Sequence, residues 1–220
     1  MAVLAPAPLP TPALRQLDPE VLAAGVAQLR AGDEALARLI DAVGPCTLTL
    51  RQDLFFALVH AIISQQISTK AKEKIVERVC ALYAPAPFPM PHQLLATPDD
   101  ELRVAGCSGA KVLYLKDLSA RIVAGTLDLD RLPNLPDEDV IAALIGVKGI
   151  GRWTAEMLLI FSLGRLDVWP VDDLGVAVGV QRLLGLPERP KPKELRIIGE
   201  RWRPYRTLVS WYLWRMPRTL

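Results

Sequence analysis

The sequence predicts an all-α fold, and three observations support that fold class. Apolar residues recur at the three- and four-residue spacing of helices along nearly every segment. Helix start signals, in which Asp, Ser or Thr can cap the helix and a proline or an acid often follows, alternate with glycines that end helices. No segment shows a convincing strand alternation, and the 220 residues, 51% of them hydrophobic, can bury a sizeable core.

The N-terminal part of the chain is expected to start with a disordered, Pro/Ala-rich segment at 1–12. A helix is expected at 18–30, because it opens with DPE, which supplies a capping side chain, a proline at the first helical position and an acid. A second helix is expected at 33–43, where Gly-Pro ends it.

Two apolar helices are expected at 53–64 and 68–83, joined by the polar junction SQQ at 64–66. Adjacent glutamines between apolar helices are unusual. They form either a solvent-exposed turn or a loop whose amides reach base edges or fill a gap in a duplex. A stiff, proline-rich linker is expected at 84–91.

The second half of the chain continues with capped helix starts and glycine stops. One further helix is expected directly after Gly151. The others are expected at 97–106, 108–124, 136–145, 174–184, 193–201 and 204–215, with a loop at 126–135.

The charge of the chain is unevenly distributed. The net charge is +2, but residues 188–220 hold nine basic and three acidic side chains. Such a basic segment suits a polyanionic partner, although a solvated helix surface would show the same composition.

The cysteines and the N-terminus indicate a cytoplasmic protein. The three cysteines are far apart and form no CxxC pair, which fits a reducing interior. There is no signal-peptide pattern and no apolar run of about 18 residues, so no membrane partner is expected. Nothing in the sequence indicates more than a monomer.

The segment GVKGIG at 146–151 lies between two expected helices. Gly149 and Gly151 leave backbone N–H groups accessible near a helix N-terminus, which suits one phosphate. Val147 and Ile150 are expected to pack beneath the turn as apolar plugs. A bare GxG turn is also typical of a simple helix corner, so its meaning depends on the residues that follow.

Those residues carry a family resemblance. The segment VKGIGRWTA at 147–155, followed after a helix by VWPVDD at 168–173, resembles the helix-hairpin-helix (HhH-GPD) DNA glycosylase superfamily. Within it the chain is most similar to the alkylation-repair branch, 3-methyladenine DNA glycosylase II. AIISQQIS at 61–68 and RPYR at 203–206 add support, and the resemblance covers about residues 50–215.

The resemblance implies the helix-hairpin-helix DNA glycosylase fold, with one all-helical domain at 13–220. This domain would contain two helical subdomains with the active-site cleft between them. One subdomain is expected at about 13–50 plus 185–220, and the other, with the hairpin, at about 51–184.

The family's catalytic aspartate matches Asp173. Cleavage of an N-glycosidic bond builds positive charge on the sugar, which a nearby anion stabilises while it orients or deprotonates water. We interpret Asp172 as the N-cap of the next helix, with Asp173 in its first turn. On the residues alone, capping would explain both aspartates.

Trp153 stands where the bifunctional members of the superfamily have a Schiff-base lysine. The resemblance therefore implies a monofunctional enzyme without AP-lyase activity. Trp153 and Met157 share a helix face. With Trp214 and Trp211, they are expected to form an electron-rich pocket for cationic alkylated purines. The alternative is that these tryptophans belong to the core.

The resemblance also implies double-stranded DNA as the partner and a nucleotide flipped out of the duplex. Gln66 matches the position of the side chain that fills the resulting gap. The expected DNA-binding residues are Gln65, Gln66, Val147, Lys148, Gly149, Gly151, Arg152 and Thr154.

No cofactor is expected to be required. The four closely spaced cysteines of the iron–sulfur branch are missing, so no cluster is expected. Family members bind a monovalent cation, Na+ or K+, through hairpin carbonyls, and the matching carbonyls are those of Ile145, Val147 and Ile150.

The resemblance thus implies a monofunctional DNA glycosylase that removes alkylated purines of the 3-methyladenine or 7-methylguanine type in base excision repair. Two alternatives stay open at this point. One is a glycosylase for another lesion, such as a deaminated or mismatched base, because pocket residues decide specificity. The other is a non-catalytic helix-hairpin-helix module that only binds DNA.

Overall fold

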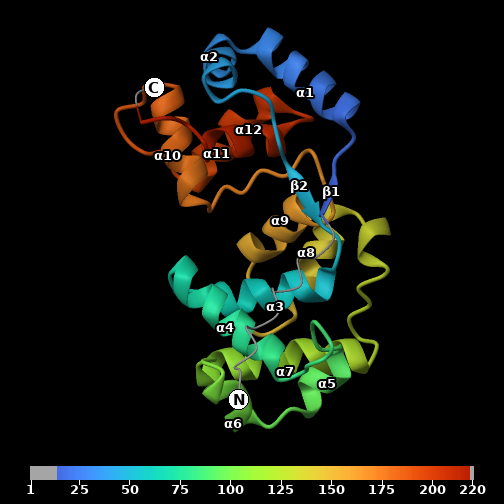
Figure 1. The fold of residues 1–220 in the computed structure, drawn as a ribbon. Coiled ribbons are helices and arrows are strands. Elements are labelled where there is room, and N and C mark those ends of the chain that lie inside the picture. Colours follow the sequence, from blue (N-terminus) through green and yellow to red (C-terminus); the bar gives the residue numbers. More distant parts are fainter. Residues whose placement is uncertain (1–13, 219–220) are drawn as a thin grey trace. The chain divides into compact units, whose positions relative to one another are not determined.

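A computed structural model describes residues 14–218 (Figure 1). The segment 1–12, expected to be disordered, lies outside the described residues. The predicted all-α fold is confirmed, since helices make up most of the described chain and the strands amount to two three-residue segments. No helix of the described chain combines the length and the apolar character needed to cross a membrane.

The chain divides into two compact units. We call Gln52–Ala155 the hairpin unit, and Leu14–Arg51 with Glu156–Leu220 the terminal unit. The division differs from the expected one, which placed residues up to 184 with the hairpin. The reason lies within the terminal unit, where Thr207 holds the segment at 165–168: its N–H donates to Leu166 O (2.9 Å) and its hydroxyl accepts from Val168 N–H (3.0 Å).

The hairpin unit is all-helical and is organised around α7. Leu115 and Leu118 of α7 are fully buried, and α3, α5 and α6 pack against this helix (Figure 1). Its elements are α3 (Leu54–Ser64), α4 (Thr69–Ala81), α5 (Pro91–Ala96), α6 (Asp99–Val104), α7 (Gly109–Val123), the 3-10 turn η1 (Leu132–Asn134) and α8 (Asp137–Ile145). The helix α9 (Arg152–Phe161) starts in this unit and ends in the terminal unit.

The terminal unit joins the two ends of the described chain around α12. All residues of this helix after Arg206 are buried, and α2 and α10 pack against it (Figure 1). Tyr212 OH donates to Gly44 O (3.1 Å), and Trp202 Nε1 donates to Asp33 Oδ2 (2.9 Å). Its elements are β1 (Leu14–Gln16), α1 (Pro19–Gly32), α2 (Glu34–Val43), β2 (Thr49–Arg51), α10 (Leu174–Leu183), α11 (Pro192–Gly199), the 3-10 turn η2 (Glu200–Trp202) and α12 (Arg206–Leu213).

Two features were not predicted. β1 and β2 pair antiparallel, with Arg15 opposite Leu50, in strands too short for an alternation to be recognised. The short helix α5 begins at Pro91, the last residue of the expected linker, because proline is favoured at the first helical position.

The predicted helix starts are confirmed at several caps. The side chains of Asp18, Ser68 and Ser108 accept backbone N–H groups two or three residues ahead. Each such cap stabilises its helix by about 1 kcal/mol.

Candidate functional site

The hairpin turn joins the end of α8 to the start of α9. The predicted burial of its two apolar plugs is confirmed, since Val147 is 1% exposed and Ile150 is 4% exposed. Val147 N–H donates to Leu144 O (3.0 Å), and Ile150 N–H donates to Val147 O (3.1 Å). The turn is therefore held from below by packing and within by two backbone hydrogen bonds.

The two glycines of the turn differ in what surrounds them. Gly149 has φ +79°, and a Cβ there would lie 2.2 Å from the ring of Tyr114 on α7. A Cβ on Gly151 would meet no atom within 4 Å among the described residues. Gly149 is thus required by the fold, whereas Gly151 leaves the backbone open to an approaching ligand.

A carboxylate that the sequence did not single out fixes the tip of the turn. Asp117 Oδ2 accepts the backbone N–H of Lys148 (2.9 Å) and Nε of Arg121 (2.8 Å). Burial raises the pKa of Asp117, but these two hydrogen bonds outweigh that effect and the pKa lies below its ordinary value. Because the Lys148 N–H is used inside the protein, only the exposed Lys148 side chain faces solvent.

Of the two expected DNA-binding residues just after the turn, Arg152 has a partner within the hairpin unit and Thr154 is buried. The Arg152 guanidinium donates to both carboxylate oxygens of Glu138, and this hydrogen bond lowers the pKa of Glu138. Both side chains are largely exposed, so the pair contributes little to stability. Thr154 is 8% exposed, so its side chain, like that of Val147, is buried.

The glutamines at the α3–α4 junction take different roles. Gln65 Nε2 donates to Gly149 O (2.7 Å), which joins this junction directly to the hairpin turn. Gln66 has φ +56° and is the one non-glycine residue of the described chain with positive φ. Its side chain is exposed. Strained backbone of this kind is typical of functional positions, because the surrounding structure has to maintain it.

The three carbonyls expected to bind a cation belong to the end of α8 and the turn. Ile145 is the last residue of α8, and Val147 O already accepts one hydrogen bond from Ile150 N–H. Each carbonyl oxygen has two lone pairs, so an oxygen that accepts one hydrogen bond can also ligate a cation. Three neutral oxygens of this kind fit a monovalent cation. Among the described residues, no group of three or more His, Cys, Asp or Glu side chains could hold a metal ion.

Asp173 lies at the start of α10 and is itself the N-cap. Its Oδ1 accepts the backbone N–H of Val176 (2.8 Å) and Nε1 of Trp214 (2.8 Å). The prediction that Asp172 caps this helix is wrong. Asp173 has the extended backbone of a cap (φ −79°, ψ 122°), whereas Asp172 is an exposed residue of the preceding turn.

The loop before Asp173 is fastened to α12. Arg206, whose side chain is 12% exposed, donates from Nε to Oδ1 of Asp167 (2.7 Å) and from Nη2 to Oδ2 (2.9 Å). This paired geometry is the strongest arrangement for Arg and a carboxylate. The start of α12 thus fixes the loop, while Trp214, just after the end of α12, reaches Asp173 directly.

The tryptophans expected in one pocket have different surroundings. Trp211 is 2% exposed, with the Arg215 guanidinium 3.8 Å from its ring centroid, so it is a core residue of the terminal unit. Trp153 is 46% exposed in the first turn of α9, and the half-buried Met157 follows one turn later. Trp214 is half-buried and stacks on Phe161 with ring centroids 5.7 Å apart.

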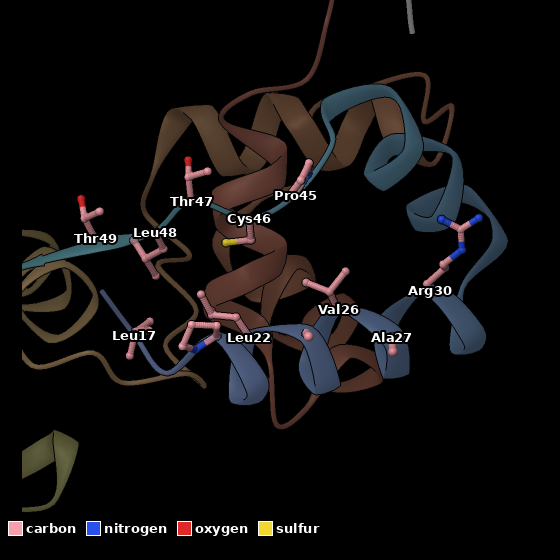
Figure 2. A pocket seen from close by; sticks show the side chains of 12 residues that line it. Leu17, Leu22, Val26, Ala27, Arg30, Pro45, Cys46, Thr47, Leu48 and Thr49 are labelled. Carbon is pink, nitrogen blue, oxygen red and sulfur yellow. The ribbon is translucent and has the colours of Figure 1, made fainter. Parts of the chain in front are cut away.

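A cavity of about 560 Å³ lies elsewhere in the terminal unit, between α1 and the segment 45–49 (Figure 2). Leu22 and Val26 of α1 face it together with Cys46. Burial raises the pKa of the Cys46 thiol. No expected site residue lines this cavity, so it is not the pocket predicted from the tryptophans.

Comparison with known proteins agrees with this geometry. Residues 59–204 match the HhH-GPD superfamily base excision DNA repair protein family. The alkylbase DNA glycosidase-like protein mag2 of Schizosaccharomyces pombe is 32% identical over 84% of this chain and 89% of its own length.

Two solved structures are similar over most of the chain. The S. pombe 3-methyladenine DNA glycosylase Mag1, in complex with abasic DNA, has a TM-score of 0.79 and 33% identity over 87% of this chain and 95% of its own. The DNA-3-methyladenine glycosidase of Bacillus halodurans has a TM-score of 0.79 and 36% identity, over 92% and 91% of the two chains. The chain therefore belongs to the HhH-GPD superfamily of base excision DNA repair proteins.

Proposed function

We propose that this protein is a monofunctional DNA glycosylase that hydrolyses the N-glycosidic bond of alkylated purines, of the 3-methyladenine or 7-methylguanine type, in base excision repair. The observation that carries this proposal is the Asp173 carboxylate, fixed at the start of α10 by two N–H donors in a chain of this superfamily. The relatives named as 3-methyladenine glycosylases support the lesion class. The proposed setting is that of chromosomal DNA, in the cytoplasm.

We assign Asp173 two roles in the reaction: it stabilises positive charge on the sugar, and it acts as a general base towards water. As the bond between the sugar and the base breaks, positive charge grows on the sugar and a carboxylate stabilises it. The same carboxylate orients water and takes its proton as the new C–O bond forms. An alkylated purine already carries positive charge, so it leaves as a neutral base and needs no strong general acid.

The absence of lyase activity is proposed from Trp153. This residue occupies the first turn of α9 and offers no amine that could attack the sugar. Lys148, in the neighbouring turn, has its backbone held by Asp117, and we assign its side chain to a phosphate contact.

The proposed grip on double-stranded DNA uses the hairpin unit. Gly151 and Gly149 present backbone N–H groups to one phosphate, with the monovalent cation at the carbonyls of the same turn. Gln66, exposed on strained backbone, enters the duplex where the nucleotide leaves the stack. Gln65 holds this residue in register with the turn through Gly149 O. A monomer is sufficient for this arrangement.

The proposal is tested with methylated duplex DNA. We expect the protein to release free 3-methyladenine and 7-methylguanine and to leave abasic sites that break only on alkali treatment. Binding of the duplex without release of any base would leave a DNA-binding module as the function. Release of deaminated or mismatched bases from a panel of defined duplexes, with no release of methylated purines, would contradict the lesion class.

The monofunctional claim is tested separately. Borohydride is added during the reaction, and the mixture is analysed for a covalent protein–DNA complex. We expect none, because trapping requires a lysine Schiff base at the sugar. A trapped complex, or strand breaks without alkali, would contradict this part of the proposal.

A further inference from the structure

Trp214 interacts with Asp173 through the edge of its indole ring. Its Nε1–H donates to Oδ1 of Asp173 (2.8 Å), the same oxygen that accepts Val176 N–H. An oxygen held by two donors, one in α10 and one just after the end of α12, cannot rotate freely about the Cβ–Cγ bond. Because the carboxylate is planar, the position of Oδ2 is set by the same two hydrogen bonds.

The approach of Trp214 to Asp173 depends on Gly175. A Cβ at this position would lie 2.7 Å from Cδ1 of Trp214 and 3.1 Å from Nε1. It would also lie 3.1 Å from Oδ1 of Asp173. Gly175 is in the first turn of α10, is exposed and has no positive φ, so its backbone alone does not call for glycine. The space that it leaves is filled by the hydrogen-bonded indole.

Rigid parts of the terminal unit hold the Trp214 ring. The backbone N–H of Trp214 donates to Ser210 O (3.0 Å), which continues the last turn of the buried helix α12. One ring face stacks on Phe161 at an interplanar angle of 27°. The indole is therefore preorganised as a hydrogen-bond donor, and its N–H is already used by the carboxylate.

We infer that Trp214 is a positioning residue for Asp173, and that Gly175 is the spacer that admits it. This inference rests on the function proposed above and changes the role expected for Trp214, from stacking on the base to orienting the carboxylate. The carboxylate has to face the anomeric carbon and the attacking water, and small misplacements of such a group cost a large part of the rate.

Two variants test the inference by independent routes. Trp214→Phe removes the donor and retains an aromatic ring for Phe161. Gly175→Ala retains the donor but inserts the Cβ that displaces the indole. Gly32→Ala is the matched control, because Gly32 also lies in a helix and a Cβ there would meet no described atom within 4 Å.

Single-turnover base release from methylated duplex is measured at saturating protein, together with affinity for an abasic duplex. We expect both variants to lose on the order of tenfold to a hundredfold in rate, with unchanged affinity and with cooperative thermal unfolding by circular dichroism that shows both proteins to be folded. Gly32→Ala should retain the wild-type rate. Wild-type rates in both site variants, or a loss of affinity that accounts for the lost activity, would overturn the positioning role.

The hydrogen bond itself is observed by NMR, without activity. The five tryptophans give five indole N–H resonances, and Trp214→Phe identifies one of them by its loss. A carboxylate acceptor deshields this proton, so Asp173→Ala and Gly175→Ala should both move it upfield more than any other. An unmoved resonance would contradict the hydrogen bond. An inactive wild-type protein with a shifting resonance would instead overturn the proposed function, and the positioning role with it.

Discussion

At the scale of single residues, Asp173 combines two roles that the sequence could only present as alternatives. Its side chain caps α10 and is also the anion assigned to the chemistry. The motif around it was recognisable, because glycines, a tryptophan and two aspartates recur at fixed offsets. The sequence did not show that Asp173 rather than Asp172 is the cap, because this depends on which of the two residues adopts extended backbone. The hydrogen bond to Trp214 joins residues 41 positions apart and leaves no local pattern.

Alanine substitutions at the two hairpin glycines, Gly149 and Gly151, should differ in their effect on stability. Gly149→Ala forces a side chain onto left-handed backbone and against the Tyr114 ring. We expect it to lower the free energy of unfolding by about 1–3 kcal/mol. Gly151→Ala meets no described neighbour within 4 Å and should leave stability nearly unchanged. Urea unfolding of the two variants measures the difference, and equal stabilities would contradict the account of the turn.

Gln66 offers a comparison of strain with function. Gln66→Ala and Gln66→Gly both remove the amide, so both should slow base release to a similar extent. Only glycine relieves the left-handed backbone (φ +56°), and we expect it to be more stable than the alanine variant by about 1 kcal/mol. The comparison needs thermal unfolding and base release on both proteins. An alanine variant as stable as the glycine variant would show that the strain is absent.

At the scale of elements, most helices could be predicted because their start signals are local. Asp18, Ser68 and Ser108 each stand directly before a helix and accept a backbone N–H of its first turn, so the structure confirms these predicted caps. The strands and α5 were missed because three to six residues are too few to establish a period. The support of the hairpin by α7 was also missed. It depends on Tyr114 and Asp117, which meet the turn only in the folded chain.

The contact between α7 and the hairpin turn predicts a pH dependence. The pKa of Asp117 is lower in the folded protein than its ordinary value of 3.8. A carboxyl with a depressed folded pKa stabilises the fold at pH values above its unfolded pKa and loses that contribution as the pH falls through the folded pKa. Asp117→Asn should therefore be less stable than the wild type at pH 7, and the difference should shrink below about pH 4. Urea unfolding across this range measures it, and a difference that is constant with pH would contradict the assignment.

At the scale of the whole molecule, the basic C-terminal segment proves less available than its composition indicated. Arg203 and Arg206 are engaged by Asp167 and Glu200 within the terminal unit. Composition could not show this, because Asp167 lies 36 residues before Arg203 in sequence. The phosphate contacts that we propose instead centre on the hairpin turn, where Lys148 has an exposed side chain.

This assignment predicts a change in salt dependence. Lys148→Gln removes one charge while the backbone N–H at this position can still reach Asp117. The slope of log affinity against log salt for an abasic duplex should become shallower by about 0.9 for the one lost phosphate contact. Affinity is measured between low and moderate salt by fluorescence anisotropy. An unchanged slope would place Lys148 outside the DNA interface.

The most direct test of the central claim compares the two adjacent aspartates in base release from methylated duplex DNA. Asparagine is a good N-cap, so Asp173→Asn should fold with α10 intact. We predict that it loses a factor on the order of 100 to 10,000 in rate, because the anion that stabilises the sugar and accepts the proton is gone. Asp172→Asn, at an exposed position that caps nothing, should retain the wild-type rate. Equal activity of Asp173→Asn and the wild type would contradict the assignment of Asp173 as the catalytic anion.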